Sequence, residues 1–159
     1  MNIRKAVITV AGREQRTLPL QTLVDRDGQT KSALSILLEE VVEAGIEEVG
    51  LVVCPGDQAA FTTAAGAHAR RIQFIEQAGS PGYGQAILCA HAFTAIEPFL
   101  HLVGDHLHVA RGGKSCARQL MEIAAAEDCA VSAVQATHES KLPYYGAVGA
   151  RRLDIGERS

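Results

Sequence analysis

Short apolar runs alternate with longer amphipathic stretches along most of the chain. Short apolar runs predict buried strands at residues 5–10 and 49–54, because strands covered on both faces lack a polar side, and further strands are predicted at 72–76 and 98–103. Two similar runs, at 130–136 and 144–149, predict a fifth and a sixth strand.

Helical spacing of apolar residues appears between these runs. Leucines and valines recur every three or four positions over residues 31–44, with Ser32 as a candidate N-cap and Gly45 just past the end. Further helices are predicted from Asp57, as a cap, to about residue 68, and over 85–95 and 116–127. Strands that alternate with helices in this way favour an α/β fold, with a mostly parallel sheet between two helical layers.

The composition fits one globular domain and excludes several classes of function. The 159 residues are 47% hydrophobic and 21% charged, which is enough for a proper core. A net charge of −3 lacks the basic excess of nucleic-acid-binding proteins, and 4% aromatic residues offer few side chains for stacking on bases. The first apolar run is too short to span a membrane, so we expect no membrane partner. The four cysteines form no C-x-x-C pair, which predicts free thiols in the cytoplasm.

The candidate site lies in the segments that follow the strands, because open parallel sheets bind ligands outside the carboxyl ends of their strands. After the first strand, Arg13 and Arg16 can hold phosphate oxygens bidentately. A solvated charged loop is the alternative. The stretch is not a P-loop, since it lacks the second glycine and the G-K-[ST] ending.

Two more segments carry candidate chemistry. Gln77 can hydrogen-bond to the edge of a base, and Gly82 lets the backbone approach a ligand closely. An ordinary strand-to-helix turn is the alternative there. Asp105 follows the fourth strand, and a lone carboxylate in that position suits Mg²⁺ with phosphate and water ligands. Zinc is the less favoured alternative, because alternation along an extended chain would put His106 and His108 on the face opposite Asp105.

Taken together, these segments resemble the sugar-phosphate nucleotidyltransferases, and most closely the bacterial UTP–glucose-1-phosphate uridylyltransferases. The resemblance is carried, in the family's order, by KAVITVAG…R.LP, LLEEVVEAGIEEVGLVV, Q…GYGQAILCAHAF, PFLHLVGDHL and YYGAV. It covers nearly the whole chain. It implies a three-layer α/β/α, Rossmann-like (GT-A-like) nucleotidyltransferase sheet that is truncated.

The resemblance also implies an activity and its residues. The activity is transfer of UMP from UTP to glucose 1-phosphate with Mg²⁺ as cofactor, so the expected partners are a nucleoside triphosphate and a sugar phosphate. By resemblance, Arg16 and Asp105 are the catalytic residues, and Asp105 is also the metal ligand. The remaining implied contacts are Ala11, Gly12, Arg13, Gln77 and Gly82 to the nucleotide, and Tyr145 and Gly146 to the sugar.

The chain departs from the family pattern in three ways. Glu14 stands where the family has its second glycine, and Gln15 where it has a threonine. The family's P-K-x-x-L-P lysine is missing: Arg26 takes its place in an ungapped alignment, but deleting the segment keeps the next helix in register. The family also continues well beyond its Y-G strand.

We therefore expect residues 1–159 to form a single nucleotidyltransferase-like domain that lacks the sugar-binding half. The alternative function is a non-catalytic nucleotide-binding or assembly module. Such a module would complete its exposed sheet edge as a homo-oligomer.

Overall fold

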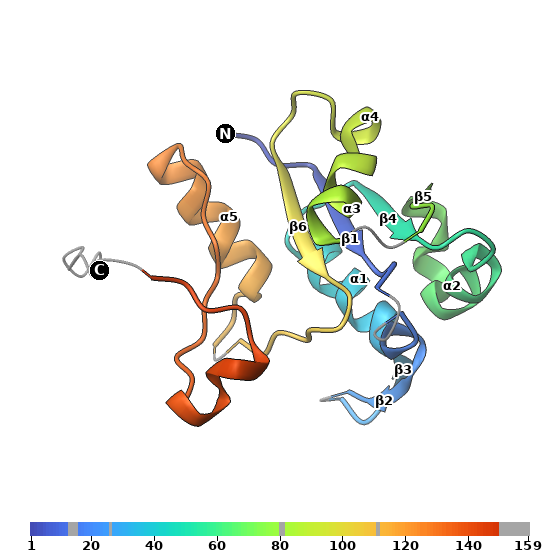
Figure 1. The fold of residues 1–159 in the computed structure, drawn as a ribbon, viewed down its shortest axis with the longest axis horizontal. Coiled ribbons are helices and arrows are strands. Elements are labelled where there is room, and N and C mark those ends of the chain that lie inside the picture. The colour runs from blue at the N-terminus through green and yellow to red at the C-terminus, as the bar shows by residue number, and fades with distance from the viewer. Residues whose placement is uncertain (13–15, 26, 80–81, 111, 150–159) are drawn as a thin grey trace.

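The protein is described here from a computed structural model that covers residues 1–12, 16–25, 27–79, 82–110 and 112–149 (Figure 1). The predictions for Arg13, Glu14, Gln15 and Arg26 lie outside these residues. The strands are β1 (Lys5–Thr9), β2 (Thr22–Val24), β3 (Thr30–Ser32), β4 (Glu48–Val53), β5 (Ile72–Glu76) and β6 (Phe99–Val103). The helices are α1 (Ala33–Glu43), α2 (Gln58–Ala65), α3 (Tyr83–Cys89), α4 (His91–Thr94) and α5 (Cys116–Glu127), with 3-10 turns η1 (Leu18–Leu20), η2 (Gly66–Arg71) and η3 (Glu139–Tyr144).

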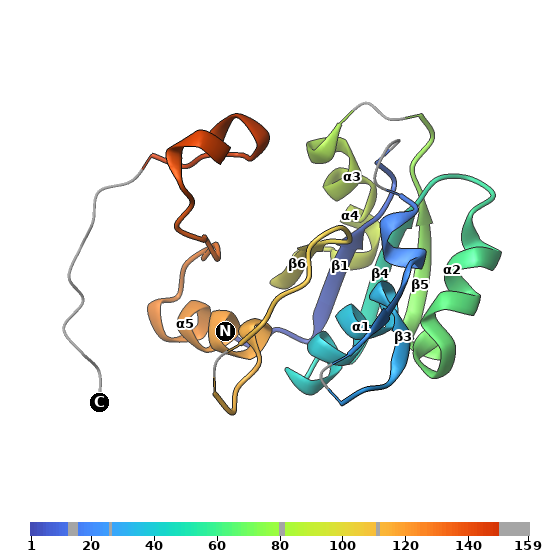
Figure 2. The same ribbon diagram turned by 90° about the horizontal axis from the view of Figure 1, so that it is seen from below.

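The centre of the fold is a parallel sheet with the strand order β5-β4-β1-β6 (Figure 2). Each of its strands was predicted. The pairing places Lys5 opposite Glu48 on one side and Phe99 on the other. Because β1 lies between β4 and β6, the loops that follow these three strands leave the sheet side by side. The predicted mostly parallel α/β fold is confirmed.

Helices cover both faces of this sheet, as the two apolar clusters show. One cluster joins Ile8 and Leu102 of the sheet to buried residues of α1, α2 and α5, such as Leu34, Phe61 and Ala117. The other joins alternate sheet residues to α3 and α4; its buried members are Val7, Ala11, Val52, Ala86, Ala90 and Phe93. Two-sided burial explains why β1 and β4 read as continuous apolar runs.

The predicted helices form, with shifted ends. The Ser32 hydroxyl caps α1 by accepting a bond from the Ser35 backbone N–H at 2.9 Å, as predicted. Asp57 occupies the N-cap position of α2 but makes no side-chain capping bond. The predicted helix over 85–95 is divided into α3 and α4 at Ala90, and it begins at Tyr83 instead of residue 85. None of the helices in the described ranges is both long and apolar enough to cross a bilayer.

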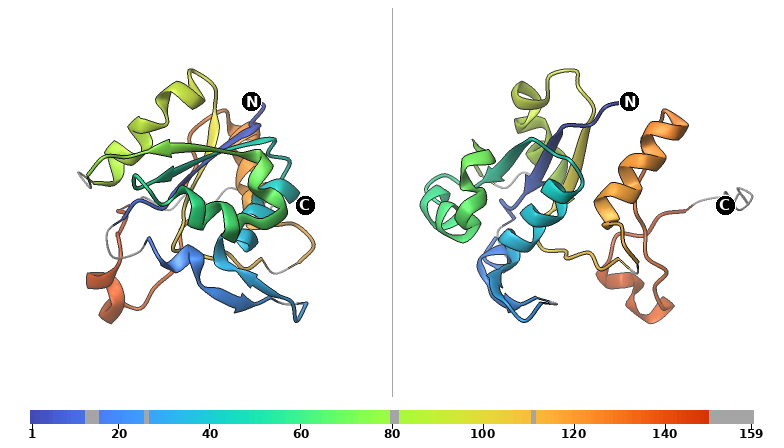
Figure 3. Two further views of the ribbon diagram at one scale, coloured as in Figure 1. Left: turned by 90° about the vertical axis from the view of Figure 1, so that its right-hand side faces the viewer. Right: turned by 180° about the vertical axis from the view of Figure 1, so that it is seen from behind.

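The predicted fifth and sixth strands are wrong. Residues 130–136 and 145–149 have no regular structure, and residue 144 ends the 3-10 turn η3. Figure 3 shows residues 128–149, which follow α5, lying outside the sheet and its helices. An apolar run forms a strand only when a neighbouring strand supplies backbone partners. In the described sheet β6 is the last strand in the order, and neither segment pairs with it.

An antiparallel hairpin, β2–β3, was not predicted. It lies in the long segment between β1 and α1 and pairs Thr22 with Ser32. Its turn is held by the Asp25 carboxylate, which accepts bonds from the backbone N–H groups of Asp27 and Gln29 at 2.9 and 2.8 Å. Gly28, at φ +75°, completes the turn. The D-x-D-G pattern was the signal that could have revealed it.

Candidate functional site

The carboxyl edge of the sheet gathers the loops that the sequence marked as a site. Beyond the strands, backbone bonds continue the ladder: Val10 N–H donates to the Val52 carbonyl at 2.9 Å, and Gly104 N–H donates to the Thr9 carbonyl at 3.0 Å. These bonds tie the first residues of the loops after β1, β4 and β6 to one another. The edge is therefore a fixed platform for the residues that follow.

Gly104 brings the β6 loop into close contact with β1. A Cβ atom at this position would lie 2.3 Å from Val10 Cγ1 and 3.2 Å from the Thr9 carbonyl oxygen. A side chain there would therefore have to displace the side chain of Val10. Asp105, the next residue, is consequently held beside the end of β1.

Asp105 presents a mostly shielded carboxylate at this edge, with 16% of its side chain exposed. Its Oδ1 lies 3.2 Å from His106 Nδ1. The prediction that His106 lies on the opposite face is wrong, because the extended chain ends at Val103 and a turn follows, with His106 N–H donating to the Val103 carbonyl at 3.4 Å.

The Asp105 carboxylate has the imidazole of His106 as a neighbour. No group of three or more His, Cys, Asp or Glu side chains that could hold a metal occurs among the described residues. A lone carboxylate suits a cation that takes its other ligands from substrate phosphates and water. The zinc alternative therefore lacks a ligand set in this part of the chain.

Arg16 lies in the loop after β1 and is tied to the loop after β4. Its backbone N–H donates to the Gly12 carbonyl at 2.9 Å. Its guanidinium Nη1 donates to Asp57 Oδ2 at 3.3 Å, and 45% of its side chain is exposed. Asp57 lies in a segment after a strand, where the sequence placed the candidate site, but only a capping role was predicted for it and its pairing with Arg16 was not.

Gln77 follows β5 and shapes the turn that leads into α3. The residue is 3% exposed, its backbone N–H donates to the Val53 carbonyl at 2.9 Å, and its Nε2 donates to the Gly82 carbonyl at 3.3 Å. Gly82 has φ +121°, a conformation that a residue with a side chain rarely adopts. A buried amide and a glycine are therefore joined across the connection from β5 to α3.

Ala11 and Gly12 occupy the start of the β1 loop. Ala11 is buried, and its carbonyl accepts a bond from the Cys54 thiol at 3.4 Å. Cys54 is the first residue after β4, in a segment that the sequence marked for the site, but its bond to Ala11 was not predicted. Its bond adds another tie between the two loops.

Tyr145 and Gly146 are not brought to this edge by any described hydrogen bond. Tyr145 is 56% exposed, and an added Cβ at Gly146 would meet nothing within 4 Å. The hydrogen bonds described for residues 135–145 all join residues of that same stretch. The sugar-binding role of both residues stays a prediction.

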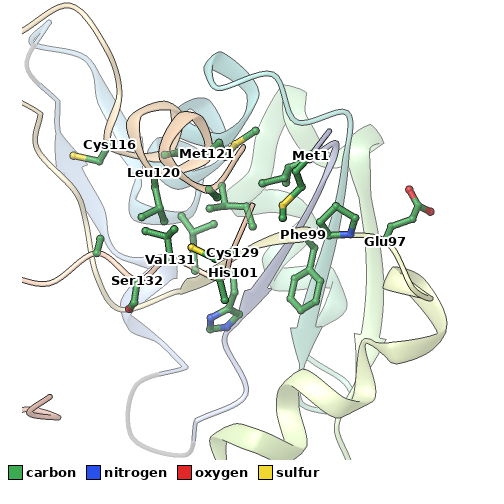
Figure 4. A pocket seen from close by; sticks show the side chains of 18 of the residues that line it. Met1, Glu97, Phe99, His101, Cys116, Leu120, Met121, Cys129, Val131 and Ser132 are labelled. Carbon is green, nitrogen blue, oxygen red and sulfur yellow. The ribbon is translucent and has the colours of Figure 1, made fainter. Parts of the chain in front are cut away.

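An apolar groove of about 1040 Å³ runs along β6, and its lining includes Tyr83 and His101 (Figure 4). Its walls are β6 on one side and α5 with residues 128–133 on the other, and Leu120, Met121 and Val131 line it. Arg16, Gln77 and Asp105 are not among its lining residues.

Comparisons with known proteins point to one family. A UTP–glucose-1-phosphate uridylyltransferase of Bacillus subtilis, YngB, is 27% identical over 172 aligned residues, which cover 92% of this chain and 57% of that protein. The enzyme of the same description from Mycoplasma pneumoniae is 28% identical, with 92% and 58% covered. The chain resembles the UTP–glucose-1-phosphate uridylyltransferases. It spans somewhat more than half the length of these relatives, and no protein-family profile matches it.

Solved structures of the same group share the fold. A UDP-glucose pyrophosphorylase in complex with UDP-glucose superposes with a TM-score of 0.64 at 20% identity, covering 80% of this chain and 55% of that one. A UTP-bound UGPase from Acinetobacter baumannii gives a TM-score of 0.63 at 23% identity, covering 80% and 54%. The resemblance drawn from the sequence is confirmed for the fold and for the group of relatives.

Proposed function

We propose that this chain is a nucleotide-binding domain of the uridylyltransferase type, which takes UTP at the carboxyl edge of its sheet. The observation that carries the proposal is the convergence of Arg16, Gln77, Gly82 and Asp105 on this edge from the loops after β1, β5 and β6. These are the residue types needed for a phosphate, a base and a cation. The relatives are uridylyltransferases by description.

Each residue has a role in this proposal. Arg16 binds triphosphate oxygens, and its half-exposed guanidinium leaves donors accessible beside the bond to Asp57. The backbone of Ala11 and Gly12 lies under the phosphates. Gln77 and Gly82 form the turn that faces uracil.

Asp105 is the residue that would hold Mg²⁺. Its carboxylate is fixed by the close approach at Gly104 and by its contact with His106. A bound Mg²⁺ would neutralise charge on the phosphates as the leaving group departs.

The reaction we propose is transfer of UMP to a sugar 1-phosphate. An oxygen of the sugar 1-phosphate attacks the α-phosphorus of UTP, the bond from that phosphorus to the bridging oxygen breaks, and pyrophosphate leaves with the electron pair. Such a displacement needs positioning and charge neutralisation more than a general base. Arg16 supplies positive charge to the triphosphate, and the turn at Gly82 positions the uracil base.

A second function, nucleotide binding without turnover, is favoured by one observation. Tyr145 and Gly146, the residues assigned to the sugar, are exposed in a stretch whose described hydrogen bonds stay within it. The described chain therefore offers a nucleotide edge without an assembled sugar site.

The proposal is tested by thermal shift and calorimetry with UTP, dTTP, CTP, ATP and GTP, with and without Mg²⁺. A ligand at about 100 times its dissociation constant stabilises a fold by roughly 2.7 kcal/mol, which is a shift of several degrees. A shift selective for UTP and dependent on Mg²⁺ is expected. Absence of a shift with every nucleotide would contradict the proposal.

A pyrophosphate-release assay with UTP and glucose 1-phosphate then separates the two functions. Release that depends on both substrates assigns transfer. UTP binding without release assigns the binding function.

A further inference from the structure

A hydrogen-bonded imidazole links three of the elements that carry the nucleotide edge. His101 lies in the middle of β6, and both of its ring nitrogens are within hydrogen-bonding distance of hydroxyl groups. Nε2 lies 3.3 Å from Thr9 Oγ1, and Nδ1 lies 3.0 Å from the Tyr83 hydroxyl. The Tyr83 ring meets the imidazole edge to face, with ring centres 5.2 Å apart (Figure 4 shows His101 on β6).

The two partners of His101 lie next to the segments that carry the proposed phosphate contacts and the proposed base contacts. Thr9 is the last residue of β1, directly before the loop that leads to Arg16. Tyr83 is the first residue of α3, directly after Gly82, whose carbonyl accepts the bond from Gln77. His101 thus bridges the phosphate side and the base side of the edge.

The chemistry of the three side chains suits a permanent bridge. A neutral imidazole has one donor and one acceptor, and each hydroxyl can do either, so both tautomers are satisfied. Burial lowers the pKa of His101 below its ordinary value, which keeps the ring neutral at pH 7. An aliphatic residue on this strand would fill the space but would leave both hydroxyls without this partner.

We infer that His101 is a positioning residue that fixes the turn at Gly82–Tyr83 relative to the end of β1, and so sets the spacing between base contacts and phosphate contacts. This inference rests on the proposed function. A nucleoside triphosphate touches both sides at once, whereas inorganic triphosphate touches only the phosphate side. Loss of the bridge should therefore weaken binding of the nucleoside triphosphate and leave binding of inorganic triphosphate unchanged.

Calorimetry with Mg²⁺ tests this difference. His101→Val and Tyr83→Phe should each weaken UTP binding by roughly three- to tenfold, which corresponds to one lost hydrogen bond. Binding of inorganic triphosphate should stay unchanged. Combining the two substitutions should cost little more than either alone, because both break the same bridge.

Two control variants separate positioning from general damage. His101→Gln keeps a donor and an acceptor at the ring position and should recover part of the UTP affinity. His91→Val replaces an exposed histidine of α4 and should change neither ligand. Equal losses for UTP and inorganic triphosphate, or no loss for either, would overturn the inference.

Hydrogen exchange in the ligand-free protein keeps the inference testable if UTP does not bind. The Ala86 N–H donates to the Gly82 carbonyl at 3.3 Å and reports on the turn. It should exchange faster in His101→Val and in Tyr83→Phe, with the core amides of β1 and β4 unaffected. Faster exchange without UTP binding to the wild-type protein would contradict the proposed function alone, whereas unchanged exchange would overturn the bridge.

Discussion

Arg16 and Asp57 show how a single pair of side chains can set the state of a binding site. The carboxylate of Asp57 lies 3.3 Å from the guanidinium of Arg16, and both side chains are partly exposed. A phosphate that binds Arg16 would have to share this guanidinium with the carboxylate or replace it. The pair therefore holds the arginine in place and also competes with the ligand.

Asp57→Asn is expected to tighten binding of inorganic triphosphate by about two- to fivefold, since exposed ion pairs contribute at most about 1 kcal/mol. Calorimetry at low salt measures the change. The gain should vanish when Arg16→Ala is also present, because the Asp57 carboxylate and the phosphate then no longer compete for a guanidinium. Weaker binding in Asp57→Asn would mean that the carboxylate chiefly orients the arginine.

Asp105→Asn removes the charge that a cation needs and keeps the shape of the side chain. We expect it to abolish the Mg²⁺-dependent part of UTP binding while leaving the melting temperature without ligand within a degree or two of wild type. A Mg²⁺ titration at fixed UTP checks this. An unchanged Mg²⁺ dependence would remove Asp105 from the site.

At the scale of the elements, close contacts at the ends of β1 and β6 fix the loops. Gly104 is the clearest case, because its missing Cβ leaves room for Val10. The hairpin β2–β3 is the other case, since it depends on the polar turn around Asp25 for its shape. Both are local features with consequences that can be measured separately.

Gly104→Ala should destabilise the protein by about 1–3 kcal/mol, the usual cost of forcing a methyl group into a packed site. Urea unfolding measures this loss. Gly113→Ala is the matched control, because an added Cβ there meets nothing within 4 Å. Equal stability of the two variants would contradict the close approach between β6 and β1.

The hairpin should respond to acid. The Asp25 carboxylate lies 2.8 Å from the Lys31 ammonium, and this bond, with those from the backbone, lowers the pKa of Asp25. A carboxyl group with a lowered pKa stabilises the fold fully above its ordinary pKa, and the effect is lost as the pH falls through the lowered value.

The urea midpoint of wild type should therefore exceed that of Asp25→Asn near neutral pH. The gap should close as the pH falls below the ordinary pKa of an aspartate, about 4, and through the lowered value. A gap that persists unchanged at the acid end would show that the charge of Asp25 is not its source.

Sequence reasoning predicted the elements whose burial determines the pattern of apolar residues. It failed where the structure depends on contacts between segments far apart in the sequence. The strands β1 and β4 are buried on both faces, so their apolar runs identified them. Residues 130–136 carry a similar pattern but have no strand beside them. The Arg16–Asp57 pair and the His101 bridge join segments far apart in the sequence, and no local spacing reveals such contacts.

At the scale of the whole molecule, β6 ends the strand order of the described sheet, and the apolar groove runs beside it. Unpaired strand edges bind other strands readily. We expect the homo-oligomer predicted from the sequence, with sedimentation faster than that of a 16.9 kDa monomer at micromolar concentration. A single monomeric species across the concentration range would contradict this expectation.

The strand order also has a consequence for how the chain folds as it is synthesised. The first strand pairs with β4 and with β6, the last strand of the sheet along the chain. While the ribosome is still making the intervening helices, one side of β1 has no neighbour. Pairings between residues so distant in sequence slow folding and leave intermediates prone to aggregate. Nascent chains stopped before residue 99 should therefore need chaperones more than chains stopped after residue 103.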